Sequence, residues 1–304
     1  ARAAAGHRFD LTRGPLLRAE LLRLGAHEHV LLLTLHHIVA DGASVGVLLA
    51  ELGAGYQARR RGQAAELPEL PFQYADYAVW HREQVAGERV TGQLRHWRDT
   101  FAERPEPLEL PWDHPRPPAP TLRGHRVTTL LDADLTRRLD GLAAANRASL
   151  FMVLAAAYAV LLRHHSGQSE VVIGTPVANR TSSTTEALIG YFVNLVALRL
   201  PVPAGASFAD LLGATREHTL GALANAEVPF DAVVAAVRQD ADPRRSPLFQ
   251  AMFALQNAFT GPIELPGLRV ELAEQDSATA KYDVNLLVER RGTELHVAIE
   301  VNAD

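Results

Sequence analysis

The residues best suited to chemistry lie in one short run, His36 to Gly42, which reads HHIVADG. Two adjacent histidines on a strand point to opposite faces, so at most one lines a given cleft while the other packs behind it. Imidazole suits proton transfer near neutral pH, because its unperturbed pKa is about 6.5. Asp41 either orients that ring directly or organises the loop through an arginine, and Gly42 permits a positive φ and close approach of a substrate backbone. Two histidines that merely pack beside an Asp-Gly turn are an equally good interpretation of the pattern alone.

The sequence does not indicate a metal site, a catalytic thiol, nucleic-acid binding or a membrane span. The histidine spacing is neither HExxH nor HxD, and no third ligand is evident. The chain has no cysteine, which excludes thiol catalysis and a disulfide framework, and its net charge of -5 lacks the basic character of a nucleic-acid binder. No apolar run reaches the roughly 18 residues of a membrane span, and no signal-peptide pattern opens the sequence. We therefore expect a cytoplasmic protein that needs no metal and binds neither nucleic acid nor membrane.

A strand and a helix must hold the histidines. The apolar run from Val30 to Leu35 predicts a strand buried on both faces, which ends at His36. After the Asp-Gly turn, apolar residues recur at helical spacing from Val45 to Tyr56, with Ser44 as the expected N-cap. The histidines are thus expected to end a strand, before a loop that launches a helix.

The rest of the chain alternates between strand and helix patterns. A proline-rich stretch from Arg104 to Leu122 excludes helix and central strand, so we place a domain crossing at 111–123, between subdomains at 1–110 and 124–304. The alternation indicates an α/β or α+β fold. Further strands are predicted at 125–131, 171–174, 191–200, 248–255, 282–289 and 294–301, and helices at 73–85, 88–103, 134–146, 150–164, 208–223 and 230–238.

The sequence resembles the condensation domains of non-ribosomal peptide synthetases. LHHIVADGAS, from Leu35 to Ser44, is similar to their HHxxxDG signature, which chloramphenicol acetyltransferase and other acyltransferases share more loosely. Later motifs follow in the family's order: YADYAVW (74–80), PVANR (176–180), IGYFVNLVALR (189–199), EVPFD (227–231) and RRSPLFQ (244–250). The resemblance implies a two-layer α+β fold, in which two chloramphenicol acetyltransferase-like subdomains form a V-shaped pseudo-dimer with the active site at their interface.

The resemblance also assigns roles to single residues. It implies that His37 is catalytic and that His36 is its buried neighbour. Asp41 matches a structural aspartate that pairs with an arginine, for which Arg180 is the candidate. A bidentate bridge between them would hold the loop behind His37.

Three further residues are expected to line the substrate tunnel: Ala43, Ser44 and Asn194. The family usually carries a larger residue, often Trp, where this chain has Ala43, so the pocket is expected to be wider here. Asn194 lies among apolar residues, where its amide needs a partner. It either binds a substrate carbonyl or joins a strand edge, and the second interpretation is favoured.

The implied reaction is amide-bond formation. An acceptor aminoacyl amine attacks a donor thioester, and both substrates are tethered to carrier domains by phosphopantetheine arms. The implied partners are the donor and acceptor carrier domains and a neighbouring adenylation domain, and no cofactor of its own is expected. Our hypothesis is that His37 accepts a hydrogen bond from the amine and removes its proton.

Alternatives remain within this resemblance. The chain begins after the family's first motifs and stops before its last helices, so we expect a domain trimmed at both ends, with weak or no activity by itself. An epimerisation domain, a free-standing acyl-CoA acyltransferase and a catalytically silent carrier-binding scaffold are the rival interpretations. A heterocyclising relative is excluded, because it would carry aspartates in place of the histidine pair.

Overall fold

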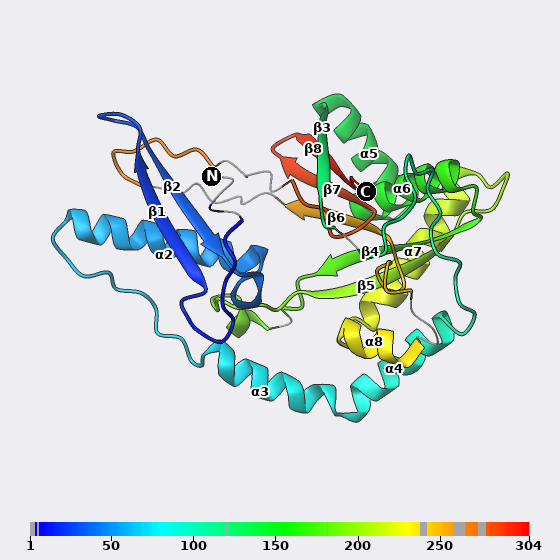
Figure 1. Ribbon diagram of the computed structural model, residues 1–304, viewed down its shortest axis with the longest axis horizontal. Coiled ribbons are helices and arrows are strands. Elements are labelled where there is room, and N and C mark those ends of the chain that lie inside the picture. The colour runs from blue at the N-terminus through cyan, green and yellow to red at the C-terminus, as the bar shows by residue number, and fades with distance from the viewer. Residues whose placement is uncertain are drawn as a thin grey trace. The chain divides into compact units, whose positions relative to one another are not determined.

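The computed structural model describes residues 4, 6–119, 121–180, 182–237, 242–257, 265–272 and 278–303 (Figure 1). The chain divides into two compact units. Unit 1 comprises Ala1–His81, Ala178–Val193 and Phe259–Ser277, and unit 2 comprises Arg82–Val177, Asn194–Ala258 and Ala278–Asp304. The predicted crossing at 111–123 lies within unit 2, and unit 1 includes segments from far downstream. The subdomain ranges predicted from the proline-rich stretch stay a prediction.

Unit 1 contains an antiparallel hairpin, one complete helix and the first eight residues of a second helix. Strands β1 (Leu17–Arg23) and β2 (His29–Leu35) pair over their whole length. The predicted strand at 30–35 is confirmed, but its burial on both faces is wrong, since Val30 and Leu31 are 36% and 44% exposed. The reason is that this sheet, in the described part of the chain, has two strands and encloses neither residue.

Helices α2 (Gly42–Arg60) and α3 (Tyr74–Val85) follow a single 3-10 turn at His37–Val39. Asp41, and not the predicted Ser44, is the N-cap of α2, because its carboxylate accepts a hydrogen bond from the Ser44 N–H at 2.8 Å. Gly42 is the first helical residue and has no positive φ, so its conformational freedom is not used there.

The described residues of unit 2 form a mixed six-stranded sheet of order β3-β8-β7-β6-β4-β5. The β4–β6 and β6–β7 pairs are parallel and the other pairs are antiparallel, which confirms a mixed α+β fold. Strand β6 begins three residues later than predicted, because Leu248 adopts a positive φ of 65° that interrupts the extended chain. The strands are β3 (Gly124–Leu131), β4 (Glu170–Val177), β5 (Asn194–Pro201), β6 (Ala251–Asn257), β7 (Val284–Arg291) and β8 (Glu294–Asn302).

In the part of unit 2 that the structure describes, the helices beside this sheet are α4 (Glu88–Thr100), α5 (Ala133–Ala145), α6 (Leu150–Ser166), α7 (Phe208–Ala224) and α8 (Phe230–Val237). Helices α5, α6 and α7 contact one another in turn and pack on β8, β4 and β5 respectively. Helix α6 is apolar on most of its surface and lies in the core. It ends at Ser166, and the capping residue Gly167 has a φ of +73°. Among the described helices none alone is long and apolar enough to cross a membrane, whereas α5 and α6, bent by 102°, pass that length and composition test as a pair.

Candidate active site

The His37 ring has a defined orientation, although His37 lies in the 3-10 turn after β2 and not, as predicted, at the end of that strand. Its Nδ1 lies 2.7 Å from the carbonyl oxygen of Ala40, and because a carbonyl only accepts, Nδ1 carries the proton. In the neutral ring Nε2 then holds the lone pair and is the nitrogen that can take up a proton. The neighbouring His36 caps the 3-10 turn, since its Nδ1 accepts from the Ile38 N–H at 3.1 Å. His36 is half-buried, not buried as the resemblance implied, and His37 is exposed.

Asp41 is the most enclosed carboxylate of unit 1's described residues, with 2% of its surface exposed. Its Oδ1 accepts from the N–H of Ser44 at 2.8 Å, and its Oδ2 accepts from the N–H of Phe192 at 3.1 Å. Burial by itself would raise the pKa of Asp41, but hydrogen bonds from Ser44, Arg180 and Phe192 outweigh burial and lower that pKa below its ordinary value. The carboxylate is thus an ionised structural centre.

Arg180 binds Asp41, though not in the bidentate manner expected. One terminal nitrogen donates to Asp41 Oδ1 at 3.0 Å, while the other donates to the carbonyls of Thr185 and Leu188. The guanidinium also lies 4.0 Å from the centre of the Phe192 ring, within cation–π range. A bidentate bridge does not form, because the backbone carbonyls of the 178–193 segment take the second nitrogen. Of the two roles left open for Asp41, the contacts fit organisation of the loop through an arginine.

A buried serine completes this network. Ser44 Oγ accepts from the N–H of Gly190 at 3.0 Å and from Arg180 at 2.9 Å, and its own proton serves either Asp41 or the Gly190 carbonyl, both at 2.7 Å. Ser44 is fully enclosed, whereas Ala43 is exposed on the first turn of α2. The Ser44 hydroxyl is therefore engaged within the loop, and the tunnel-lining roles of both residues stay a prediction.

Asn194 is the first residue of β5 in unit 2, and its amide is fully engaged there. Its Nδ2 donates to the carbonyls of Ala226 and Val228 at 2.8 and 2.7 Å, and its Oδ1 accepts from the Phe230 N–H at 3.1 Å. These contacts join β5 to the start of α8, which fits the strand-edge interpretation. A contact between Asn194 and substrate stays a prediction.

Sequence reasoning missed Tyr191, which it assigned to a strand. The structure begins β5 at Asn194 and leaves Tyr191 in the preceding loop, where its ring centre lies 5.1 Å from that of His37 at an interplanar angle of 84°. The Tyr74 hydroxyl donates to the Tyr191 carbonyl at 2.6 Å. The only sequence signal was its place in the motif IGYFVN, three residues before Asn194.

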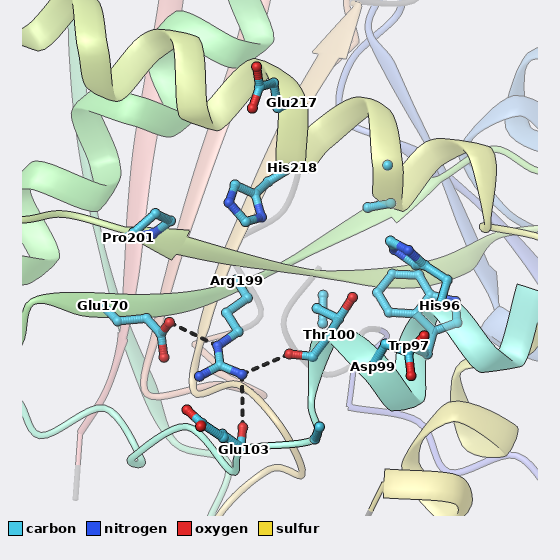
Figure 2. Close-up of a pocket in the computed structure, with 14 residues that line it drawn as sticks. His96, Trp97, Asp99, Thr100, Glu103, Glu170, Arg199, Pro201, Glu217 and His218 are labelled. Atoms are coloured by element: carbon cyan, nitrogen blue, oxygen red, sulfur yellow. Dashed lines mark hydrogen bonds and ion pairs between the residues drawn. The ribbon is translucent and has the colours of Figure 1, made fainter.

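A separate cavity of about 670 Å³ lies in unit 2 between α4, α7, β4 and β5 (Figure 2). Figure 2 shows Arg199 at its centre, bonded to the Glu170 carboxylate at 2.8 Å and to the carbonyls of Thr100 and Glu103 at 2.7 and 2.8 Å. None of the site residues predicted from the sequence lines this cavity. It is therefore distinct from the His37 site.

His96 on the wall of this cavity makes stability depend on pH. Burial lowers the pKa of His96, the Asp99 carboxylate partly opposes that shift, and His218 adds to it. Between the folded pKa and the unfolded value near 6.5, the unfolded chain binds more protons than the folded chain, so stability falls as pH falls below about 6.5.

We expect a melting temperature that decreases between about pH 7.5 and 5.5, and a shallower decrease in the His96→Gln variant. Calorimetry of both proteins, with His125→Gln on β3 as an exposed control, measures the slopes, and equal slopes in all three proteins would contradict this assignment.

Comparison with known proteins identifies the class to which this fold and this histidine-centred loop belong. The family model described as Condensation domain matches residues 1–304, and the chain therefore belongs to the condensation domain family. The family that its motifs indicated is thereby confirmed.

Its relatives are much longer proteins. The chain is 44% identical to malpinin synthetase of Mortierella alpina over 91% of its length, and 40% identical to one of the linear gramicidin synthase proteins of Brevibacillus parabrevis over 97%. It spans only 4% and 6% of these two relatives.

Solved structures share the fold. The X-domain from teicoplanin biosynthesis superposes with a TM-score of 0.90 at 29% identity, over 99% of this chain and 70% of that one. The first condensation domain of the calcium-dependent antibiotic synthetase, in complex with a substrate analogue, gives 0.78 at 26% identity, over 94% of this chain and 62% of that one. These matches confirm the predicted chloramphenicol acetyltransferase-like fold class.

Proposed function

We propose that this chain carries the catalytic histidine of a condensation site, which forms an amide between a carrier-bound donor thioester and the amine of a carrier-bound aminoacyl acceptor. The observation that supports the proposal is the hydrogen bond from His37 Nδ1–H to the Ala40 carbonyl on an exposed ring. In the neutral ring this bond places the lone pair on Nε2, in the form that a general base requires.

The reaction follows from that tautomer. The acceptor nitrogen attacks the donor carbonyl carbon and forms the C–N bond, and its proton passes to Nε2 of His37. The tetrahedral intermediate then collapses, the C–S bond breaks, and the proton is delivered to the leaving sulfur. An α-amine has an ordinary pKa near 7.7–8.0, so a part of it is neutral near pH 7, and alignment of the two tethered arms supplies much of the rate.

The proposed partners are the donor and acceptor carrier domains and a neighbouring adenylation domain. The relatives support this, because the synthetases matched are many times longer than the chain, as multidomain enzymes are. The substrates arrive on phosphopantetheine arms of the carriers. We propose that the domain works in the cytoplasm without a metal or cofactor of its own.

The decisive experiment uses the complete domain that contains this chain, with the carriers encoded on either side of it. The upstream carrier is loaded with a donor acyl group, the downstream carrier with an aminoacyl group, and both are analysed by intact-protein mass spectrometry. We expect the downstream carrier to gain the mass of the donor acyl group, and no gain when carriers lack the phosphopantetheine arm. Product only from acyl-CoA would indicate a free-standing acyltransferase, and an inverted donor without transfer would indicate an epimerisation domain.

A silent binding scaffold is the second candidate. It is favoured by the likeness to the teicoplanin X-domain, which has also been solved in complex with OxyB. For a scaffold, the carriers would bind the domain and neither would change in mass.

A further inference from the structure

We propose that Tyr191 is a positioning residue that fixes the plane of the His37 ring. The proposal rests on the proposed catalytic function of His37. It assigns Tyr191 no contact with substrate and no proton transfer of its own. Its role is to keep Nε2 pointed in one direction before and during the reaction.

The rings of Tyr191 and His37 are in direct contact. The two rings meet edge to face, with centres 5.1 Å apart and planes at 84°. Aromatic pairs prefer this geometry at separations of 4.5–7 Å, so the contact is stabilising. The Nδ1 hydrogen bond to Ala40 is a single tether, about which an exposed ring still swings. A perpendicular ring beside it removes that freedom and prevents the flip that would exchange the two nitrogens.

The backbone of Tyr191 is itself held in place by hydrogen bonds. The Tyr74 hydroxyl donates to its carbonyl at 2.6 Å. The preceding residue, Gly190, donates its N–H to Ser44 Oγ at 3.0 Å and accepts from the Asp41 N–H at 3.1 Å. A Cβ on Gly190 would overlap the Tyr74 ring, so only glycine allows this close approach. The backbone beside His37 is therefore tied at three points.

Tyr191 is not part of the buried core of its unit. It is 38% exposed, whereas Tyr77 nearby in the same unit is 8% exposed and belongs to a small buried cluster. Truncation of Tyr191 removes less buried apolar surface than truncation of a core aromatic would. An effect on catalysis without a large loss of stability is the expected signature.

The test compares four variants in the complete domain. Tyr191→Phe keeps the ring, Tyr191→Leu keeps apolar bulk without a ring, Tyr191→Ala removes both, and Tyr56→Ala on α2 is the matched control. Long-range ¹⁵N correlation spectra of histidine-labelled protein report the tautomer of His37, whose signals are assigned by their loss in His37→Ala. We expect one Nδ1-protonated form in the parent, Tyr191→Phe and Tyr56→Ala, and a mixture of tautomers in Tyr191→Leu and Tyr191→Ala.

Kinetics with loaded carriers give the second readout. We expect kcat to fall about tenfold or more in Tyr191→Ala and Tyr191→Leu with KM little changed, because ground-state binding is intact and alignment is lost. Tyr191→Phe is expected to stay within about twofold of the parent.

The outcomes separate this proposal from the proposed function. A single unchanged tautomer in both ring-free variants overturns the positioning role, whatever the activity. A loss of kcat in Tyr191→Phe equal to that in Tyr191→Ala also overturns it, because the hydroxyl and not the ring would then matter. If the parent makes no amide, the proposed function fails, while the spectra still decide whether Tyr191 holds the ring.

Discussion

Replacement of His37 by alanine in the complete domain is expected to lower amide formation at least about a hundredfold, the range that a lost general base typically costs. The variant removes Nε2, the nitrogen that holds the lone pair of the neutral ring when Nδ1 donates to Ala40. Uncatalysed attack by the neutral fraction of the amine remains, because the carriers still bring both arms together. Single-turnover mass spectrometry with both carriers loaded measures the rate without interference from product release.

The control for this variant is His164→Ala, which removes another exposed histidine, at the end of α6. It is expected to keep the parent rate. The His37→Ala protein is expected to have a melting temperature close to that of the parent, because removal of an exposed side chain disrupts little packing. A near-normal rate in His37→Ala would remove the histidine from the mechanism and leave alignment of the two arms as the source of catalysis.

Replacement of Asp41 by alanine is expected to destabilise unit 1 by about 3–5 kcal/mol, the usual cost of removing one partner from a buried ion pair. The Arg180 and Asp41 side chains are 6% and 1% exposed, so the change leaves a guanidinium charge enclosed without its carboxylate. The N–H groups of Ser44 and Phe192 lose their acceptor as well. Hydrogen exchange of α2 amides in denaturant measures this unit separately from unit 2.

The matched control is Arg269→Ala, which breaks the exposed pair with Glu271, whose side chains are 89% and 74% exposed. That change is expected to cost less than about 1 kcal/mol. The pH dependence follows from the lowered pKa of Asp41. Its stabilisation is present above the unfolded value near 3.9 and is lost as pH falls through the lower folded value, so parent and Asp41→Ala converge in strong acid. An equal cost for both variants at pH 7 would contradict a structural role for the Asp41–Arg180 pair.

Many of the helices and strands could be predicted from the spacing of apolar residues along the chain. The helices predicted at 134–146 and 150–164 appear as Ala133–Ala145 and Leu150–Ser166, and the strand at 30–35 appears within β2. The loop from His36 to Gly42 was also identified, since its residue types are rare together and the later motifs followed in order. These features depend on residues close to one another in the chain.

The rest depended on contacts between distant residues. Tyr191 to Val193 reads as strand, but hydrogen bonds from Gly190 and Phe192 reach Ser44 and Asp41, 146 and 151 positions away, and hold this stretch out of the β5 ladder. Both terminal nitrogens of Arg180 were expected to bind the Asp41 carboxylate. No local sequence pattern shows that the backbone carbonyls of Thr185 and Leu188 bind one of these nitrogens instead. The ring contact between Tyr191 and His37 arises from the same long-range ties, so it had no periodic signal.

The discontinuous make-up of unit 1 bears on how such domains are recombined. A crossover between two relatives anywhere from residue 82 to residue 177 takes Asp41, Ser44 and Tyr74 from one parent and Arg180 and Gly190 from the other. The proline-rich stretch at 104–122 looks like a natural breakpoint, yet a junction there splits this network. In a hybrid enzyme that takes residues 1–81 and 178–193 from the same parent, both sides of this network come from one protein. We expect such hybrids to keep a stable unit 1.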